Sequence, residues 1–254
     1  MIKLIINGCN GKMGQVITRL AQGCDDISIA AGVTRNPSKL PNSYPVYRSF
    51  KEAEVNADVV VDFSNPEMIP DTVDYCVKNH TALVTGTTGL SEKDLEMLKQ
   101  ASESIPVFVS ANMSIGIRVL IDLALKAAAT LGDEFDIEIL EKHHNEKKDA
   151  PSGTAMMIAN ELKNQISDGL EFVYDRSKIR EKRKPNEIGI SAIRGGTIPG
   201  EHTVFFAGKD EVIEIKHSAL SRDMFGRGAI RAARYIASKP KGYYTMKTML
   251  EELI

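Results

Sequence analysis

The chain has 254 residues, of which 43% are hydrophobic and 26% charged, and this length allows one large domain or two smaller ones. A formal net charge of -2 gives no electrostatic indication of a nucleic-acid partner. No apolar stretch approaches the ~18 residues that a membrane span needs, and no signal-peptide pattern begins the chain, so we expect a cytoplasmic protein without a membrane partner. The three cysteines include no Cys-x-x-Cys pair, which argues against a disulfide framework and against a zinc site.

In the first half of the chain, short β-branched apolar runs alternate with longer amphipathic stretches. We expect strands at Ile2–Ile6, Ile27–Val33, Ala57–Phe63, Thr81–Thr85 and Pro106–Val109. Apolar residues recur at i, i+3 and i+4 between them, which predicts helices from about Gln15, over Met68–Lys78 and over Leu90–Ala101. Ser91 followed by Asp94 is typical of a helix start. Nearly continuous apolar strands separated by helices predict a parallel sheet covered on both faces.

After Asn112 the pattern is typical of an α+β domain. Helices are expected at Ile115–Leu131, Ala155–Leu162, Gly226–Ala237 and Met246–Leu253. Strands are expected at Phe135–Leu140, Ile188–Ile193, Thr203–Phe206 and Val212–Ile215. The last three follow one another closely, which predicts a second, more antiparallel sheet. The polar stretch Asn164–Asn186, with a basic cluster at 176–184, is expected to be a solvated loop.

A glycine-rich loop directly follows the first expected strand and precedes a helix pattern. It contains Gly8, Cys9, Asn10, Gly11, Lys12, Met13 and Gly14. A tight turn of this kind lets backbone N–H groups at a helix N-terminus approach a pyrophosphate closely. The spacing Gly-x-x-Gly-x-x-Gly therefore predicts a dinucleotide site, although a plain strand-to-helix turn could use the same glycines.

The second expected strand ends at Thr34 and Arg35, where dinucleotide-binding proteins often carry an acidic residue for the adenosine ribose. A carboxylate would repel a 2′-phosphate, whereas the guanidinium of Arg35 can pair with one. This position therefore favours NADPH over NADH, with Lys39 close behind. The alternative is that Arg35 is an ordinary surface arginine and that NADH also binds.

Three further loops follow expected strand ends. They are Asp62–Pro66, Gly86–Gly89 and Ser110–Ser114. In an open α/β sheet, ligands bind beyond the carboxyl ends of the strands. The small and hydroxyl-bearing residues of these loops are therefore expected to line a cofactor cleft.

The segment Glu141–Ala155 combines groups suited to acid–base chemistry on an anion. His143 and His144 stand side by side with Lys147 a short distance on, and Pro151–Thr154 supplies a helix N-terminus. Together they predict a small anionic substrate with a proton donor or acceptor beside it. Taken singly, each histidine could be structural, and Ser152 or Thr154 a helix cap. Because no histidine pair has i, i+4 spacing, we expect no metal.

The core of this segment, His-His-x-x-Lys-x-Asp-Ala-Pro-Ser-Gly-Thr-Ala, resembles the signature of the dihydrodipicolinate reductase (4-hydroxy-tetrahydrodipicolinate reductase) family, which acts in the diaminopimelate route to lysine. Other stretches resemble family motifs in the family's order: Gly8–Gly14, Gly86–Gly89, Ala111–Ser114 and Gly200–Thr203. The resemblance therefore covers nearly the whole chain.

This resemblance implies a Rossmann-like dinucleotide-binding domain formed by residues 1–113 and 220–254. It also implies an α+β domain at 114–219 whose mixed sheet serves substrate binding and homotetramer contacts. The family's cofactor contacts match Gly8, Cys9, Asn10, Gly11, Lys12, Met13, Gly86, Thr87, Thr88, Ser110, Ala111, Asn112 and Met113. Thr34 departs from the acidic residue of some members, which puts an NADH preference in doubt and leaves Arg35 for NADPH.

The resemblance also implies roles at the substrate. His143 matches the proposed proton donor and acceptor, Lys147 the proposed proton donor, and His144 a substrate contact, whereas Gly153 and Thr154 match residues that hold a substrate carboxylate. The implied reaction is reduction of 4-hydroxy-tetrahydrodipicolinate to tetrahydrodipicolinate with loss of water. Lys147 and a protonated His143 are expected to stabilise negative charge on the ring.

Two other functions fit a bound dinucleotide. One is an epimerase or lyase that uses the dinucleotide without net turnover, and the other is a regulator that senses NADP. Both leave the segment from His143 to Thr154 unexplained.

Overall fold

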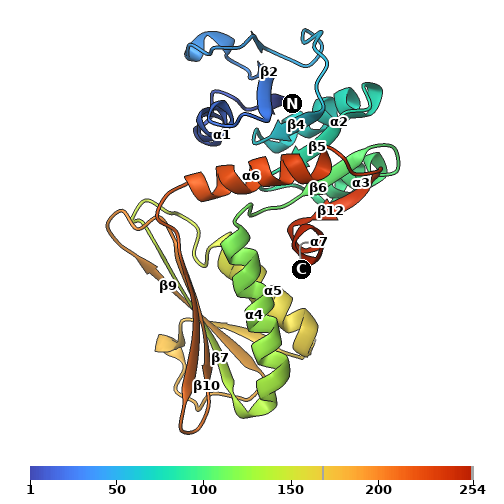
Figure 1. Cartoon of the computed structure of the whole chain (residues 1–254). Helices are drawn as coiled ribbons and strands as arrows, with labels where there is room; N and C mark the ends of the chain where they lie inside the picture. The colour runs from blue at the N-terminus through green and yellow to red at the C-terminus, as the bar shows by residue number, and fades with distance from the viewer. Residues whose placement is uncertain (168, 253–254) are drawn as a thin grey trace. The chain divides into compact units, whose positions relative to one another are not determined.

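The computed structural model describes residues 1–167 and 169–252, which divide into two compact units (Figure 1). The first unit comprises Met1–Ile115 and the described part of Arg222–Ile254, and the second comprises Gly116–Ser221. The chain therefore leaves the first unit once and returns to it.

The described residues of the first unit form a seven-stranded, wholly parallel sheet. In spatial order its strands are β12 (Gly242–Thr245), β6 (Pro106–Val109), β5 (Ala82–Thr85), β4 (Val59–Asp62), β1 (Ile2–Asn7), β2 (Ile27–Val33) and β3 (Val46–Tyr47). The order reverses at β1, which lies between β2 and β4, as in Rossmann folds. The predicted Rossmann-like parallel sheet is confirmed.

Helices cover both faces of this sheet and explain why its strands are almost continuously apolar. Helices α1 (Lys12–Gln22) and α6 (Asp223–Ile236) pack on a core that includes Leu4 and Ile6. On the other face, α2 (Ile69–Lys78) and α3 (Glu92–Ala101) share a core with Ile5. Successive residues of β1 thus enter opposite cores, as the alternation of side chains along a strand requires.

The second unit is a mixed sheet with helices on one face. Among its described residues the strand order is β11 (Val212–Ser218), β10 (Glu201–Ala207), β7 (Asp136–His143), β9 (Glu187–Arg194) and β8 (Glu171–Tyr174). β10 pairs antiparallel with both neighbours, whereas β7, β9 and β8 are parallel. Helices α4 (Ile115–Leu131) and α5 (Gly153–Ile166) pack on the sheet through Leu120, Ile158 and their neighbours. The predicted second sheet is confirmed.

The expectation of a solvated loop at Asn164–Asn186 was wrong for the part of it that is described, which excludes Asp168. Helix α5 continues to Ile166, Glu171–Tyr174 forms β8, and a 3₁₀ turn covers Arg176–Lys178. Two of the basic residues have partners, since Arg176 pairs with Glu187 and Arg183 contacts Asp136, Glu138 and the carbonyl of Ile137. The other four basic residues of 176–184 are exposed, as expected. A four-residue edge strand carries too little periodicity to stand out in a polar stretch.

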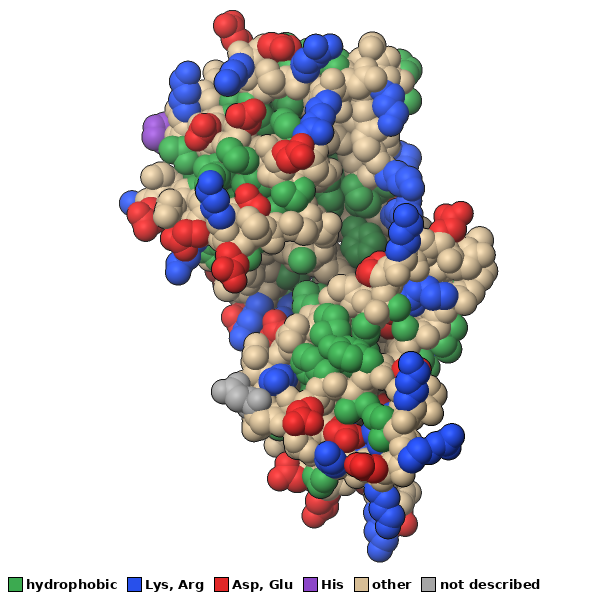
Figure 2. Space-filling view, turned by 180° about the vertical axis from the view of Figure 1, so that it is seen from behind, with side chains coloured by type: hydrophobic (Ala, Val, Ile, Leu, Met, Phe, Trp, Pro, Cys, Tyr) green, Lys and Arg blue, Asp and Glu red, His purple; other side chains and the backbone are tan. Residues whose placement is uncertain are grey.

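The last element, α7 (Met246–Glu251), corresponds to the expected helix Met246–Leu253, of which Leu253 lies outside the described residues. None of the helices in the described ranges is both long and apolar enough to cross a membrane. Figure 2 shows acidic and basic side chains interspersed over the face in view, so this face presents no extended field of one sign.

Candidate functional site

The glycine loop is packed too tightly for other residues at two of its positions. Gly8 has a φ of +80°, and a Cβ there would lie 2.5 Å from the carbonyl oxygen of Phe63. A Cβ at Gly14 would lie 2.2 Å from the carbonyl oxygen of Gly8. These glycines therefore let the loop turn directly from β1 into α1 while it packs against Phe63, which follows β4.

The start of α1 suits a phosphate. Its N-cap is Gly11, and within the described chain no side chain caps the helix and no acidic residue lies in its first turn. The first backbone N–H groups of a helix have no intrahelical partner, and the helix dipole favours negative charge there. Lys12 adds a cation at the same point.

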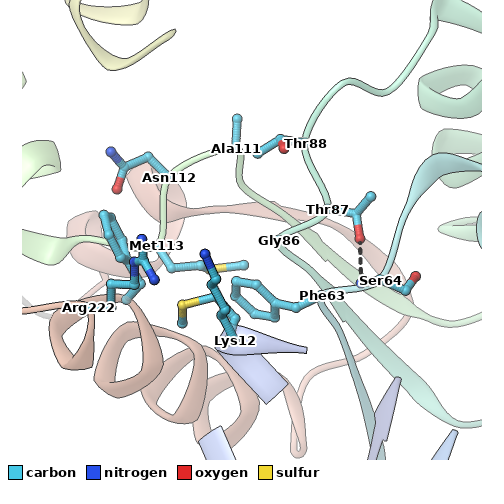
Figure 3. Close-up of a pocket in the computed structure, with 12 residues that line it drawn as sticks. Lys12, Phe63, Ser64, Gly86, Thr87, Thr88, Ala111, Asn112, Met113 and Arg222 are labelled. Atoms are coloured by element: carbon cyan, nitrogen blue, oxygen red, sulfur yellow. Dashed lines mark hydrogen bonds between the residues drawn. The ribbon is translucent and has the colours of Figure 1, made fainter. Parts of the chain in front are cut away.

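A cavity of about 390 Å³ lies at the carboxyl edge of the parallel sheet (Figure 3). Its lining residues come from five separate stretches of chain: Lys12, Met13, Phe63, Ser64, Gly86, Thr87, Thr88, Ala111, Asn112, Met113, Arg222 and Phe225. Eight of the expected cofactor residues are thus brought together. Phe63 packs so closely on Gly86 that a Cβ at Gly86 would lie 2.4 Å from its ring.

A second cavity, of about 270 Å³, shares Phe63 and Ser64 with the first. It collects five more of the expected residues around the end of β2: Gly8, Asn10, Gly11, Thr34 and Arg35, together with Lys39. The two cavities therefore follow the sheet edge across the switch between β1 and β4, where dinucleotides bind in such folds.

Two of the expected cofactor residues line neither of these two cavities in the described chain. Cys9 is fully buried, and burial raises the pKa of its thiol to about 11. Ser110 donates a hydrogen bond of 2.7 Å to the carbonyl oxygen of Asn112 and so shapes the loop. Any contact of Cys9 with a cofactor is left to its backbone.

Asp62 connects the loops of the first cavity through hydrogen bonds. This fully buried carboxylate accepts hydrogen bonds from Asn7 Nδ2 (2.8 Å), Thr85 Oγ1 (2.9 Å) and Thr87 Oγ1 (2.7 Å). The backbone N–H of Ser64 donates to Thr87 Oγ1 at 3.1 Å (Figure 3). The ends of β1, β4 and β5 are therefore held in one network.

Arg35 projects from the end of β2 and is 62% exposed. Its guanidinium pairs with Glu67 and donates a hydrogen bond of 3.3 Å to Asn65 Oδ1. Both partners lie in the segment that follows β4. The guanidinium thus stands at the rim of the second cavity, where an acidic side chain already engages it.

In the second unit, His143 ends β7 and is buried. Its Nδ1 lies 2.6 Å from Oε2 of Glu141, a carboxylate with no exposed surface. Glu141 also accepts two hydrogen bonds of 2.7 Å from Arg194 and one of 2.9 Å from the backbone N–H of Ser152.

These contacts set the charge states. Burial opposes ionisation of Glu141, but hydrogen bonds from Arg194, His143 and Ser152 outweigh it and lower the pKa of the carboxyl. Desolvation lowers the pKa of His143 and outweighs the opposing effect of Glu141. Burial lowers the pKa of the neighbouring His202 to about 3. The lowered pKa of His143 favours its neutral form, whereas the sequence-based expectation was a protonated imidazole, and that expectation stays a prediction.

The start of α5 lies beside these histidines. Ser152 is its N-cap, accepts a hydrogen bond from the backbone N–H of Ala155 at 3.2 Å and lies 3.0 Å from Nε2 of His202. Gly153 and Thr154 form the first turn. The prediction that Pro151–Thr154 supplies a helix N-terminus is confirmed, and the helix begins two residues before the expected Ala155.

The loop after β7 carries the other expected substrate residues. His144 is half-buried, and its carbonyl accepts a hydrogen bond from the backbone N–H of Lys147 at 3.2 Å. The Nζ of Lys147 lies 2.9 Å from Asp149 Oδ1. Among the described residues, no cluster of His, Cys, Asp and Glu is suited to a metal ion. A cation, a helix N-terminus and a neutral imidazole can together bind an anion and exchange a proton with it.

Comparison with known protein families identifies the chain. The model "Dihydrodipicolinate reductase, N-terminus" matches residues 2–113, and "Dihydrodipicolinate reductase, C-terminus" matches residues 116–250. The chain belongs to the dihydrodipicolinate reductase family. It is 52% identical over 252 residues to the 4-hydroxy-tetrahydrodipicolinate reductase of Caldanaerobacter subterraneus subsp. tengcongensis, covering 99% of each chain. It is 46% identical over 250 residues to that of Clostridium tetani, covering 98% of this chain and 97% of the relative.

Solved structures share the fold of this family member. A dipicolinate-bound dihydrodipicolinate reductase from Paenisporosarcina sp. TG-14 matches with a TM-score of 0.79 at 23% identity, covering 96% of this chain and 97% of that one. A probable dehydrogenase from Thermotoga maritima matches with a TM-score of 0.66 at 12% identity, covering 99% and 93%. The oxidoreductase class and the Rossmann-type domain predicted from the sequence are thus confirmed.

Proposed function

We propose that this chain reduces 4-hydroxy-tetrahydrodipicolinate to tetrahydrodipicolinate in lysine biosynthesis, consuming NADPH or NADH and one proton and releasing water. The observation that carries the proposal is His143 and Lys147 beside the start of α5, in a chain whose relatives of 52% and 46% identity have this activity in their names. Neither an epimerase or lyase nor an NADP-sensing regulator is favoured by those relatives.

The second unit would bind the cyclic dicarboxylate. The N-terminal turn of α5 offers backbone N–H groups and the hydroxyl of Thr154 to one carboxylate, and Gly153 leaves open space, since a Cβ there meets no atom within 4 Å. His144 would contact the substrate from the loop after β7. Fixing a carboxylate in this way orients the ring, which is a large part of catalysis in a reaction of two bound partners.

His143 and Lys147 would handle protons. A neutral His143 can accept a proton from the ring carbon next to the leaving hydroxyl and return it after reduction. Lys147 would donate a proton to the leaving hydroxyl, so that it departs as water, and would stabilise the negative charge that forms on the ring; each such group typically contributes about 10²–10⁴ in rate. The bound nicotinamide supplies the hydride.

The first unit would bind the dinucleotide, and its residues fit one. The uncapped start of α1 suits the pyrophosphate, and the two cavities along the sheet edge suit the two halves of the molecule. Arg35 and Lys39 support a preference for NADPH, because both can pair with a 2′-phosphate. The assignment of residues 1–113 and 220–254 to cofactor binding and of 114–219 to substrate binding is part of this proposal.

We also propose a homotetramer, assembled through the face of the second sheet opposite α4 and α5. Ile193 is 45% exposed and Val212 57% exposed on that face, and Phe205 is half-buried there. Sedimentation velocity of the purified protein tests this, and a monomer at micromolar concentration would contradict it. The cytoplasmic location expected from the sequence stays a prediction.

Steady-state kinetics with enzymatically generated 4-hydroxy-tetrahydrodipicolinate and each cofactor test the activity. We expect net oxidation of NADPH that depends on substrate, whereas an epimerase would convert substrate without net oxidation and a regulator would show no rate. His143→Gln should lower kcat far more than it raises KM, and Lys147→Ala should impair both. Turnover near that of the wild type in both variants would remove these residues from the mechanism.

A further inference from the structure

In the second unit, the carboxylate of Glu141 connects His143 to the start of α5. Oε2 of Glu141 accepts from His143 Nδ1 and from Arg194 Nη1, and Oε1 accepts from the backbone N–H of Ser152 and from Arg194 Nη2. Glu141 is fully buried, and the side chain of Arg194 is 19% exposed. The proton-transfer residue and the start of the anion-binding helix are therefore attached to the same group.

These contacts also fix which nitrogen of His143 carries the proton. An ionised carboxylate can only accept hydrogen bonds, so the proton of a neutral His143 must sit on Nδ1. Nε2 then carries the lone pair. On that side lies Gly200, where a Cβ would stand 3.0 Å from Nε2 and where φ is +153°. A side chain at position 200 would crowd Nε2, and glycine avoids this crowding.

We propose that Glu141 is a positioning residue: held by Arg194, it fixes His143 with Nε2 as the atom that exchanges a proton with the substrate, and aligns that atom with the start of α5. This inference rests on the proposed function. Second-layer partners of this kind set ring orientation and tautomer, and their loss commonly lowers activity about 10- to 100-fold at metal-bound histidines. We expect an effect of similar size here.

Four charged or titratable groups face His143 from the elements around it. Glu141 lies on its own strand, Arg194 on β9, His202 on β10, and Lys147 in the loop that follows. The rings of His143 and His202 lie edge to face with centroids 5.2 Å apart. Glu141 is the one acid among these four groups, so its neutralisation should lower the pKa of His143 further.

The test compares Glu141→Gln with the wild type in two measurements. In kinetics, we expect kcat to fall about 10- to 100-fold with a much smaller change in the KM for the dicarboxylate, and the acidic limb of kcat/KM to move to lower pH. In ¹⁵N-histidine NMR, with His143 assigned by means of His143→Gln, we expect the wild type to hold the proton on Nδ1. The variant should lose this tautomer preference.

Glu187→Gln is the matched control, because Glu187 is a largely buried carboxylate on β9 that is also paired with an arginine, Arg176. It should leave His143 and turnover unchanged. If Glu141→Gln does not fold, Arg194→Lys keeps the charge but removes one of the two hydrogen bonds to Glu141, and should shift the same readouts to a smaller extent.

The NMR measurement needs no substrate, so it separates this inference from the proposed function. Absence of turnover in the wild type would overturn the function. An unchanged tautomer and titration of His143 in the folded variants would overturn the positioning role, even with an active wild type.

Discussion

At the scale of single residues, cofactor choice depends on a competition at Arg35. Its guanidinium is engaged by Glu67, so a 2′-phosphate must displace or share that carboxylate. Glu67→Gln should therefore lower the KM for NADPH several-fold and leave that for NADH nearly unchanged. The substitution removes a negative charge that repels the 2′-phosphate, which NADPH carries and NADH lacks. Arg35→Ala should raise the KM for NADPH more than that for NADH.

Initial rates over a range of each cofactor measure this ratio. Glu92→Gln removes an exposed acid from the first turn of α3 and serves as the matched control. If Glu67→Gln changed the KM values for NADPH and NADH equally, the carboxylate would act through the overall charge of the protein and not through repulsion of the 2′-phosphate.

His202 should make stability depend on pH. Its pKa is lowered from 6.5 to about 3 by burial, so below pH 6.5 the unfolded chain binds a proton that the folded chain excludes. Stability should therefore be fully present above pH 6.5 and decrease as the pH falls towards 3, by an amount of order 5 kcal/mol over the whole interval. Urea midpoints measured against pH should show a shallower decline in His202→Gln.

The exposed His80 provides the comparison, since His80→Asn should preserve the wild-type pH dependence. A decline equally steep in His202→Gln and in the wild type would assign the acid sensitivity to other groups.

Local sequence patterns predicted the cavity-lining residues that lie in short signatures, and missed those that join a cavity from elsewhere in the chain. Gly8, Gly86 and Asn112 each follow a strand of the parallel sheet, so their convergence on one edge follows from the fold class. Arg222 and Phe225 line the first cavity from the start of α6, far along the chain. Spacing alone carries no signal for them, because the chain passes through the second unit before it returns.

At the scale of elements, the start of α5 is held by Ser152, which caps the helix and contacts His202. Ser152→Ala should destabilise the protein by about 1–2 kcal/mol, since it removes the cap and a hydrogen-bond partner of a buried histidine. It should also raise the KM for the dicarboxylate, because the first turn would fray. Denaturant unfolding and steady-state kinetics measure the two effects.

Ser91→Ala removes the cap of α3, where Ser91 and Asp94 form a capping box. It should lower stability by about 1 kcal/mol and leave both KM values unchanged. If the KM for the dicarboxylate were unchanged in Ser152→Ala, the helix cap would have no role in substrate binding.

The elements predicted best were the long or buried ones. Ile27–Val33, Pro106–Val109 and Ile115–Leu131 were predicted with their observed bounds. The missed strands are short and take their stability from a neighbour: β3 has two residues, and β12 pairs only with β6 at the edge of the described sheet. Such strands form because an adjacent strand offers unpaired backbone groups, which is a tertiary effect.

At the scale of the whole molecule, each ligand should protect its own unit. In hydrogen-exchange mass spectrometry, NADPH should slow exchange around residues 8–15, 86–88 and 222–226, and dipicolinate should slow it around 141–155. Protection by dipicolinate confined to the first unit would contradict the assignment of the dicarboxylate to α5.

The first unit needs chain from both ends. Helix α6 contributes Ala229, Ala233 and Ile236 to the core under β1 and β4, and Arg222 and Phe225 complete the cavity at the sheet edge. A ribosome delivers these residues only after the entire second unit has been made. The N-terminal segment, synthesised first, therefore has one face of its sheet covered only in part, by α1, until α6 is made, and a nascent chain should acquire its capacity to bind a dinucleotide last. Premature termination before Glu141 would then release a chain in which neither the dinucleotide site nor the dicarboxylate site is complete.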